Sequence, residues 1–251
     1  MAVFALALAA SLRIASLNLC SDEYLLLLAL PGEVASVSRL AQDPAETSLA
    51  PLAQRVPGNR GRIEDIIALS PDLVLTMGSS GGRSSGSIAR ALGMHVVDLP
   101  QPGSLDEVAT NLRTVAQVLG DTRRADALIA KLARLRATSP RTGVDSIYLG
   151  HGGISQSPSS SLGAQWMRTA GLVQRPLSGG KASLEILATS PPKLLLISNY
   201  RSGQMSQGQY WLTHPIVART PSRRITTDGR PWTCAGPLMI PEIERLRQVV
   251  K

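Results

Sequence analysis

The chain has 251 residues, of which 43% are apolar, and this is enough for one large globular domain or two smaller ones with real cores. Its formal net charge of +8 comes almost wholly from arginine, because the only lysines are Lys131, Lys181, Lys193 and Lys251. The basic residues are scattered, and no helix-turn-helix, zinc-finger or RNP motif accompanies them, which argues against a nucleic-acid partner.

Residues 1–12 are almost entirely apolar or small, up to Arg13. This run is too short to cross a bilayer, which takes about 20 residues. It resembles the apolar region of a signal peptide, with small residues for cleavage near Ala7, Ala9 or Ala10. The positively charged start of a signal peptide is missing, so a truncated or misplaced start stays open. We expect an exported protein.

The first half of the chain alternates strands with helices, which predicts βαβ units and a parallel sheet. Ser21 or Asp22 is the expected N-cap of the first helix, and Pro31 lies past its end. Strands are expected at 13–17, 33–38, 72–77 and 94–100, and helices at 21–30, 62–70 and 87–92.

Two helices are expected in the middle of the chain. Ser104 and Glu107 have the spacing of a capping box, and apolar residues follow at helical spacing until Gly120. A second helix begins after Asp121 or Thr122 and ends before Pro140, and it is long enough to act as a rigid strut. The expected organisation is an N-terminal α/β lobe at 13–103, a helical connector at 104–139 and a C-terminal α/β lobe at 140–251.

The second half returns to alternating elements and repeats part of the first. Residues 63–75 align without a gap on residues 184–196, with Glu64 and Glu185 each seven residues before a proline. A carboxylate at the same place in both halves suggests a duplicated surface feature. Strands are expected at 146–150, 193–198 and 224–226, and helices at 161–171, 183–190, 210–218 and 241–250.

Six stretches, taken in order, carry a resemblance to a known family: RIASLNLCSDEYLLLLALPGEVASVSRLAQDP, VPGNRGRIEDIIALSPDLVL, MRTAGLV, SLEILATSPPKLLLIS, THPIV and WTCAGP. Together they resemble the periplasmic substrate-binding proteins of ABC importers for cobalamin and ferric siderophores, the helical-backbone or type III family. No single stretch is highly specific, but their order and spacing from Arg13 to about Leu246 are.

The resemblance implies a fold and a function. The fold would be α/β, with two Rossmann-like lobes that have parallel central sheets and are joined by one long helix, here about 122–138. The protein would be a periplasmic, non-catalytic monomer that captures its ligand in the cleft between the lobes. It would deliver the ligand to an ABC permease in the inner membrane, and Glu64 and Glu185 would dock against arginines of that permease.

Ligands of open α/β sheets collect at the carboxyl ends of the strands. Arginines there suit carboxylate or catecholate oxygens, and aromatic side chains suit a ring or macrocycle. A site with several arginines and few aromatic residues favours an anionic ferric siderophore over a corrinoid. Iron or cobalt would arrive inside its chelator, so neither a cofactor nor a protein-built metal site is required. The candidate ligand-binding residues are Asn18, Arg39, Ser79, Ser80, Arg83, His151, Tyr200, Arg201, Arg230 and Trp232.

The two cysteines, Cys20 and Cys234, lie far apart in the sequence. In an exported protein they could form one long-range disulfide, and two free thiols are the alternative.

A hydrolase is the alternative function. Residues 78–82 read Gly-Ser-Ser-Gly-Gly and fit the G-x-S-x-G pattern, which would make Ser80 the nucleophile of an α/β-hydrolase esterase. The His151-Gly152-Gly153 stretch, which looks like part of an oxyanion motif, follows Ser80 instead of preceding it. No G-x-G-x-x-G opens a helix in the first βαβ unit either. The sequence therefore favours a binding protein over an enzyme.

Overall fold

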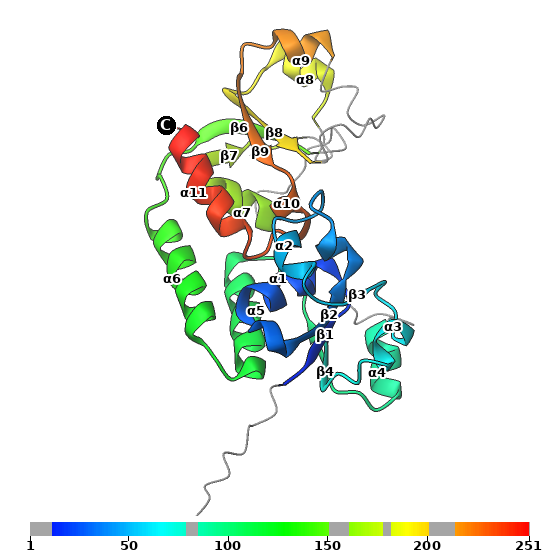
Figure 1. The fold of residues 1–251 in the computed structure, drawn as a ribbon. Coiled ribbons are helices and arrows are strands. Elements are labelled where there is room, and N and C mark those ends of the chain that lie inside the picture. The colour runs from blue at the N-terminus through cyan, green and yellow to red at the C-terminus, as the bar shows by residue number, and fades with distance from the viewer. Residues whose placement is uncertain (1–11, 79–84, 151–160, 178–181, 201–213, 251) are drawn as a thin grey trace, which may run out of the picture. The chain divides into compact units, whose positions relative to one another are not determined.

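The computed structural model describes residues 12–78, 85–150, 161–177, 182–200 and 214–250 (Figure 1). The chain divides into two compact units. The first unit comprises Met1–Gln42 and Leu49–Pro100, and the second comprises Asp43–Ser48 and Gln101–Lys251. The predicted signal peptide lies almost wholly outside the described residues.

The first unit is built on a five-stranded sheet in the order β3-β2-β1-β4-β5, in which every pair of neighbours is parallel. Four of these strands lie where the sequence predicts them. β3 was not predicted, because two residues are too few to show a hydrophobic period. The strands are β1 (Ile14–Ser16), β2 (Val34–Ser38), β3 (Gly58–Asn59), β4 (Leu73–Met77) and β5 (Val96–Leu99).

Helices cover both faces of this sheet. The long helix α1 contacts β1, β2 and β4, whereas α4 contacts β4 and β5. Ala15, Leu17 and Val74 form one apolar cluster with Ile63, the N-cap of α3, and with Ile66 of α3. Burial on both faces explains why the strands read as continuous apolar runs. The helices are α1 (Leu19–Leu28), α2 (Ala50–Ala53), α3 (Glu64–Ile67) and α4 (Ser85–Ala91), with 3₁₀ turns at Pro31–Glu33 and Arg39–Gln42.

The N-cap of α1 is Asn18, so the prediction of Ser21 or Asp22 was wrong. The Asn18 side chain accepts a hydrogen bond from the Ser21 amide at 3.0 Å. The helix begins at Leu19, two residues before Ser21, because the Asn18 side chain supplies the oxygen that caps it.

The second unit has a four-stranded parallel sheet in the order β7-β6-β8-β9. The three longer strands confirm the predicted ones. β7 was not predicted, because it begins directly after Gly171 and its three residues are too few to show a hydrophobic period. The strands are β6 (Val144–Leu149), β7 (Leu172–Gln174), β8 (Leu194–Asn199) and β9 (Arg223–Asp228).

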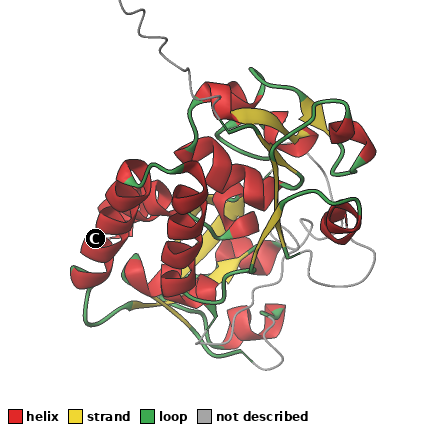
Figure 2. Cartoon of the chain, turned by 90° about the horizontal axis from the view of Figure 1, so that it is seen from below, coloured by secondary structure: helices red, strands yellow, loops and turns green. Residues whose placement is uncertain are grey.

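Alternate residues of β8 enter two different apolar clusters, as the period of a strand requires. Leu194 and Leu196 belong to the cluster that contains Trp166 of α7 and Ile243 of α11. Leu195 belongs to the cluster that contains residues of α8 and α9. Figure 2 shows the helices of the chain in red and the strands in yellow. The helices of the two faces are α7 (Leu162–Thr169), α8 (Leu184–Thr189), α9 (Pro215–Arg219) and α11 (Met239–Val250).

The two middle helices are confirmed as α5 (Leu105–Leu119) and α6 (Arg123–Ala137). Ser104 caps α5 by accepting from the Glu107 amide at 3.2 Å, and Gly120 ends it at a left-handed φ of 71°. Asp121 accepts from the Arg123 amide at 3.0 Å at the start of α6. Both helices group with the second unit, and the role of α6 as a strut between lobes stays a prediction.

The fold class is therefore confirmed: two α/β units with parallel sheets. The repeat between the halves has a topological counterpart, because β4 pairs with β1 just as β8 pairs with β6. Glu64 and Glu185 lie in the first turns of the corresponding helices α3 and α8.

The remaining differences concern the C-terminal part of the chain. The helix predicted over 210–218 is described only from residue 214, and α9 extends to Arg219. The short helix α10 (Arg230–Cys234) was not predicted, and α11 begins before Pro241, at Met239.

Four arginines of the second unit donate hydrogen bonds to backbone carbonyls at the C-terminal ends of helices. Arg247 reaches Leu135 O at the end of α6 and Thr169 O at the end of α7. Arg224 reaches carbonyls of α9, Arg223 those of α11, and Arg175 those just after α8. The last carbonyls of a helix have no partner within that helix, and a cation at this end also complements the helix dipole.

Asp22 is a fully buried carboxyl group on α1. It accepts hydrogen bonds from the backbone amide of Ser38 at 3.2 Å and from the Ser38 hydroxyl. Burial disfavours the ionised form and raises the pKa of Asp22 to about 6, although the hydrogen bonds from Ser38 lower it in part.

This pKa predicts that Asp22 makes folding stability fall as the pH rises. Between about pH 4 and pH 6 the native carboxyl binds a proton that the unfolded chain has lost, so its contribution is fully present below pH 4 and is lost by about pH 6. Asp22→Asn removes this dependence. We expect the free energy of unfolding of the wild type, measured by urea titration, to rise relative to that of the variant by about 2–3 kcal/mol when the pH is lowered from 7 to 4. A constant difference between the two proteins across that range would contradict the prediction.

Candidate functional site

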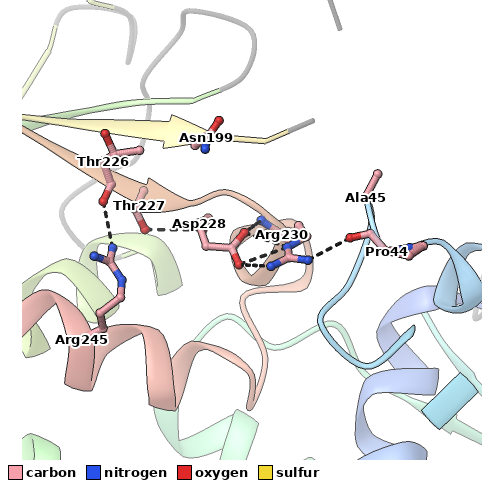
Figure 3. Close-up of a pocket in the computed structure, with 8 residues that line it drawn as sticks. All are labelled: Pro44, Ala45, Asn199, Thr226, Thr227, Asp228, Arg230 and Arg245. Atoms are coloured by element: carbon pink, nitrogen blue, oxygen red, sulfur yellow. Dashed lines mark hydrogen bonds and ion pairs between the residues drawn. The ribbon is translucent and has the colours of Figure 1, made fainter. Parts of the chain in front are cut away.

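A pocket of about 590 Å³ lies in the second unit at the carboxyl ends of β8 and β9 (Figure 3). Asn199 ends β8, Asp228 ends β9, and the two residues are register partners. This is the sheet edge at which ligands of open α/β sheets bind. The pocket is lined by Pro44, Ala45, Asn199, Thr226, Thr227, Asp228, Arg230 and Arg245.

The turn from β9 into α10 brings Arg230 to this pocket. Its guanidinium donates two hydrogen bonds to Asp228, from Nε to Oδ1 at 3.0 Å and from Nη2 to Oδ2 at 2.7 Å. Its Nη1 donates a third to Pro44 O at 2.8 Å. Burial raises the pKa of Asp228, but the hydrogen bonds from Arg230 outweigh it, so the pKa lies below the usual value. The pKa of Arg230 is raised in turn by Asp228. Both groups stay ionised at neutral pH.

Arg245, on α11, is the second cation of the pocket, and it pairs with Glu242. The pair is two-pronged, with Nε to Oε2 at 2.9 Å and Nη2 to Oε1 at 2.6 Å. Each arginine of the pocket is therefore balanced by a carboxylate. The pocket offers oriented donors and acceptors to a ligand, without a large net positive charge.

Two aromatic side chains predicted for ligand binding lie close to the pocket. Trp232 stacks on Tyr148 with the ring centroids 4.7 Å apart, and its Nε1 donates to Thr227 Oγ1 at 2.8 Å. Burial raises the pKa of Tyr148 to about 12, so it remains a neutral partner. The Tyr200 hydroxyl donates to Glu46. The structure thus brings Tyr200, Arg230 and Trp232 to one region of the second unit.

The candidates of the first unit have other partners or stand apart. The Asn18 amide donates to Thr76 Oγ1 and to Met77 O, both at 3.1 Å, so this side chain joins the carboxyl ends of β1 and β4 besides capping α1. Arg39 is exposed in a 3₁₀ turn. Neither residue is part of the described pocket, and a ligand role for either stays a prediction.

Five candidates lie outside the described residues: Ser79, Ser80, Arg83, His151 and Arg201. The pairing of Cys20 with Cys234 also stays a prediction. In the part of the chain that the structure describes, no group of three or more His, Cys, Asp or Glu side chains could hold a metal ion.

Sequence reasoning missed most of the polar residues at the pocket: Asn199, Thr227, Asp228 and Arg245, which line it, and Glu242, which pairs with Arg245. Asp228 could have been found, because it lies two residues after the strand predicted at 224–226 and two residues before Arg230. Glu242 and Arg245 look like an ordinary i, i+3 pair on an amphipathic helix. Nothing local marks them as neighbours of β9.

The family model described as "Periplasmic binding protein" matches residues 14–138, which hold all five strands of the first sheet together with α5 and α6. The chain belongs to the periplasmic binding protein family. It is a binding protein and not an enzyme, and the esterase built on Ser80 gains no support. None of the curated proteins matches the sequence.

Solved structures of periplasmic binding proteins share the fold. The heme-binding protein RhuT from Roseiflexus sp. RS-1 is 21% identical, with a TM-score of 0.70 over 96% of this chain and 100% of RhuT. The vitamin B12-binding protein BtuF of Vibrio cholerae is 18% identical, with a TM-score of 0.66 over 95% of this chain and 96% of BtuF. Helicobacter pylori CeuE, solved with Ni(II) bound, is 16% identical, with a TM-score of 0.69 over 97% and 84%.

The backbone at the end of β9 predicts a sensitive site at Gly229. A Cβ there would lie 2.5 Å from Tyr200 Cβ and 3.0 Å from Tyr200 Cα, so the ends of β8 and β9 would have to move apart. Gly229→Ala should destabilise the protein by about 1–3 kcal/mol in urea unfolding.

Gly103→Ala is the matched control for that experiment. Its added Cβ would meet only Glu107 Oε2, at 3.7 Å, which is an ordinary contact. Equal stability losses in the two variants would show that the β8–β9 approach is not the cause.

Proposed function

We propose that this chain is the solute-binding component of an ABC importer, which captures an organic metal chelate outside the cytoplasm and delivers it to an inner-membrane permease. The observation that carries the proposal is the pocket at the carboxyl ends of β8 and β9, in a chain of the periplasmic binding protein family. Export to the periplasm is part of the proposal. Among the described residues no helix is both long and apolar enough to cross a membrane.

A ferric siderophore is the first candidate ligand. The pocket is lined mainly by hydroxyl, amide, carboxylate and guanidinium groups, which suit a chelate with a polar surface better than an apolar macrocycle face. Heme and corrinoids are the other candidates, since relatives of the same fold are named for heme and vitamin B12. In each case the metal would enter within its chelator and leave with it.

A titration with three classes of metal chelate tests this proposal. Ferric siderophores of the catecholate and hydroxamate types, hemin and cyanocobalamin are each added to the protein while tryptophan fluorescence is recorded. We expect one saturable response, with a Kd between micromolar and nanomolar, or about 8 to 12 kcal/mol of binding free energy. Absence of a saturable response to every probe would contradict the proposed function.

A matched pair of arginine variants locates the binding site. Arg245→Gln should weaken the response about tenfold, because it removes a pocket cation. Arg175→Gln breaks a comparable pair with Asp145, at the opposite end of the sheet, and should leave affinity unchanged.

Glu64 and Glu185 are the proposed docking contacts for the permease. Both side chains are exposed, and no described residue donates a hydrogen bond to either carboxylate. They stand at equivalent places in two units of like topology. Free carboxylates on two such helices could meet two cationic sites of one partner, where opposite charges set orientation and on-rate.

The docking prediction is tested by charge reversal. Glu64→Arg combined with Glu185→Arg should abolish uptake of the ligand by cells that carry the importer, while the Kd for the ligand stays within twofold. Asp126→Arg reverses another exposed carboxylate, on the first turn of α6, and should leave uptake intact. A loss of ligand affinity in the double variant would place the two residues in the binding site or the fold instead.

A further inference from the structure

Glu242 is a buried carboxylate, 7% exposed, on the α11 helix beside the pocket. It accepts hydrogen bonds from three different residues. Thr227 Oγ1 donates to its Oε1 at 2.6 Å, the Asp228 amide donates to the same oxygen at 3.2 Å, and Arg245 supplies the two bonds described above. All three donors belong to residues that line the pocket.

The hydrogen bonds around Thr227 have a fixed direction. A hydroxyl has one proton, and the charged acceptor at 2.6 Å takes it in preference to Asp228 O at 3.5 Å. Thr227 Oγ1 then accepts from Trp232 Nε1, an indole nitrogen that can only donate. The orientation of the Trp232 ring is therefore set by Glu242 through one intervening hydroxyl.

Arg245 depends on the same carboxylate. Besides Glu242, its guanidinium donates only to Thr226 O, at 2.9 Å, among the described residues. A buried carboxylate needs a compensating charge. An exposed arginine keeps one geometry only when two parallel hydrogen bonds hold its guanidinium. Glu242 and Arg245 thus hold each other in place, and Glu242 determines where the Arg245 guanidinium lies in the pocket.

We propose that Glu242 is the positioning residue of the pocket: it holds the indole of Trp232, the backbone of Asp228 and the guanidinium of Arg245 in one arrangement. The consequence for ligand affinity rests on the proposed function. The arrangement itself does not, because it exists without a ligand. Glu242 acts through these groups and need not touch the ligand.

Two substitutions separate the two arms of this arrangement in NMR spectra of the ligand-free protein. Glu242→Gln puts an amide nitrogen where Oε2 faces Arg245 Nε, so the Nε–H resonance of Arg245 should shift and exchange faster with water. Thr227→Val removes the intervening hydroxyl, so the indole N–H resonance of Trp232 should shift while that of Arg245 stays. Unchanged resonances in both variants would overturn the proposal.

The control breaks a similar ion pair elsewhere in the same unit. Asp145 pairs with Arg175 through two prongs, near the amino end of β6 and away from the pocket. Asp145→Asn should lower stability without moving the resonances of Trp232 or Arg245. If it moves them as Glu242→Gln does, the effect is a general loosening of the unit and the proposal fails.

The functional test measures the Kd of each variant for whichever of ferric siderophore, hemin and cyanocobalamin saturates the wild type. Glu242→Gln should raise the Kd about tenfold, and adding Arg245→Gln should raise it little further, because the first change already acts through Arg245. Fully additive losses would overturn the positioning role. If no probe binds the wild type, the proposed function fails, and the resonance shifts still decide whether Glu242 holds the pocket walls.

Discussion

The parallel direction of β6, β8 and β9 is the constraint on which the candidate site depends. Because neighbouring strands run the same way, their carboxyl ends meet at one edge, and Asn199 comes to lie beside Asp228. The turn after β9 then delivers Arg230 and Trp232 to that edge within four residues of Asp228. A different interaction lies near the amino ends of these strands, the ion pair of Asp145 with Arg175. Polar side chains thus divide between the two edges of one sheet, with the proposed ligand pocket at one edge and a structural ion pair at the other.

The arginine-derived charge of the chain has a structural explanation that composition alone does not reveal. Arg175, Arg223, Arg224 and Arg247 reach helix-end carbonyls, and the pocket arginines are held by carboxylates. The planar guanidinium, with five donors, can join two carbonyls or two helices at once, which a lysine ammonium cannot do with the same geometry. Four arginines therefore support the fold, and the two arginines of the pocket are each paired with a carboxylate.

Regular periodicity made the α/β class, the long helices α5 and α6 and most strands predictable from the sequence. The capping residue Ser104 and the left-handed Gly120 were predictable for the same reason, because each acts within its own turn. The short strands β3 and β7 were not, since pairing with a neighbour stabilises them and their own few residues do not. The pocket follows the same rule. Arg230 was a candidate because the resemblance places it beside the strand ends, whereas Glu242 comes to lie beside the pocket only because α11 packs against β9.

The segment Asp43–Ser48 has a consequence for how the protein folds. It belongs to the second unit although the chain on both sides of it belongs to the first. Its bond from Arg230 to Pro44 spans 186 residues, and the bond from Tyr200 to Glu46 spans 154. Such long-range contacts must wait for most of the chain to be synthesised, and closing loops of this size costs entropy that local helices do not pay. This wall of the pocket is therefore completed late, and a fragment that begins at residue 101 would lack it.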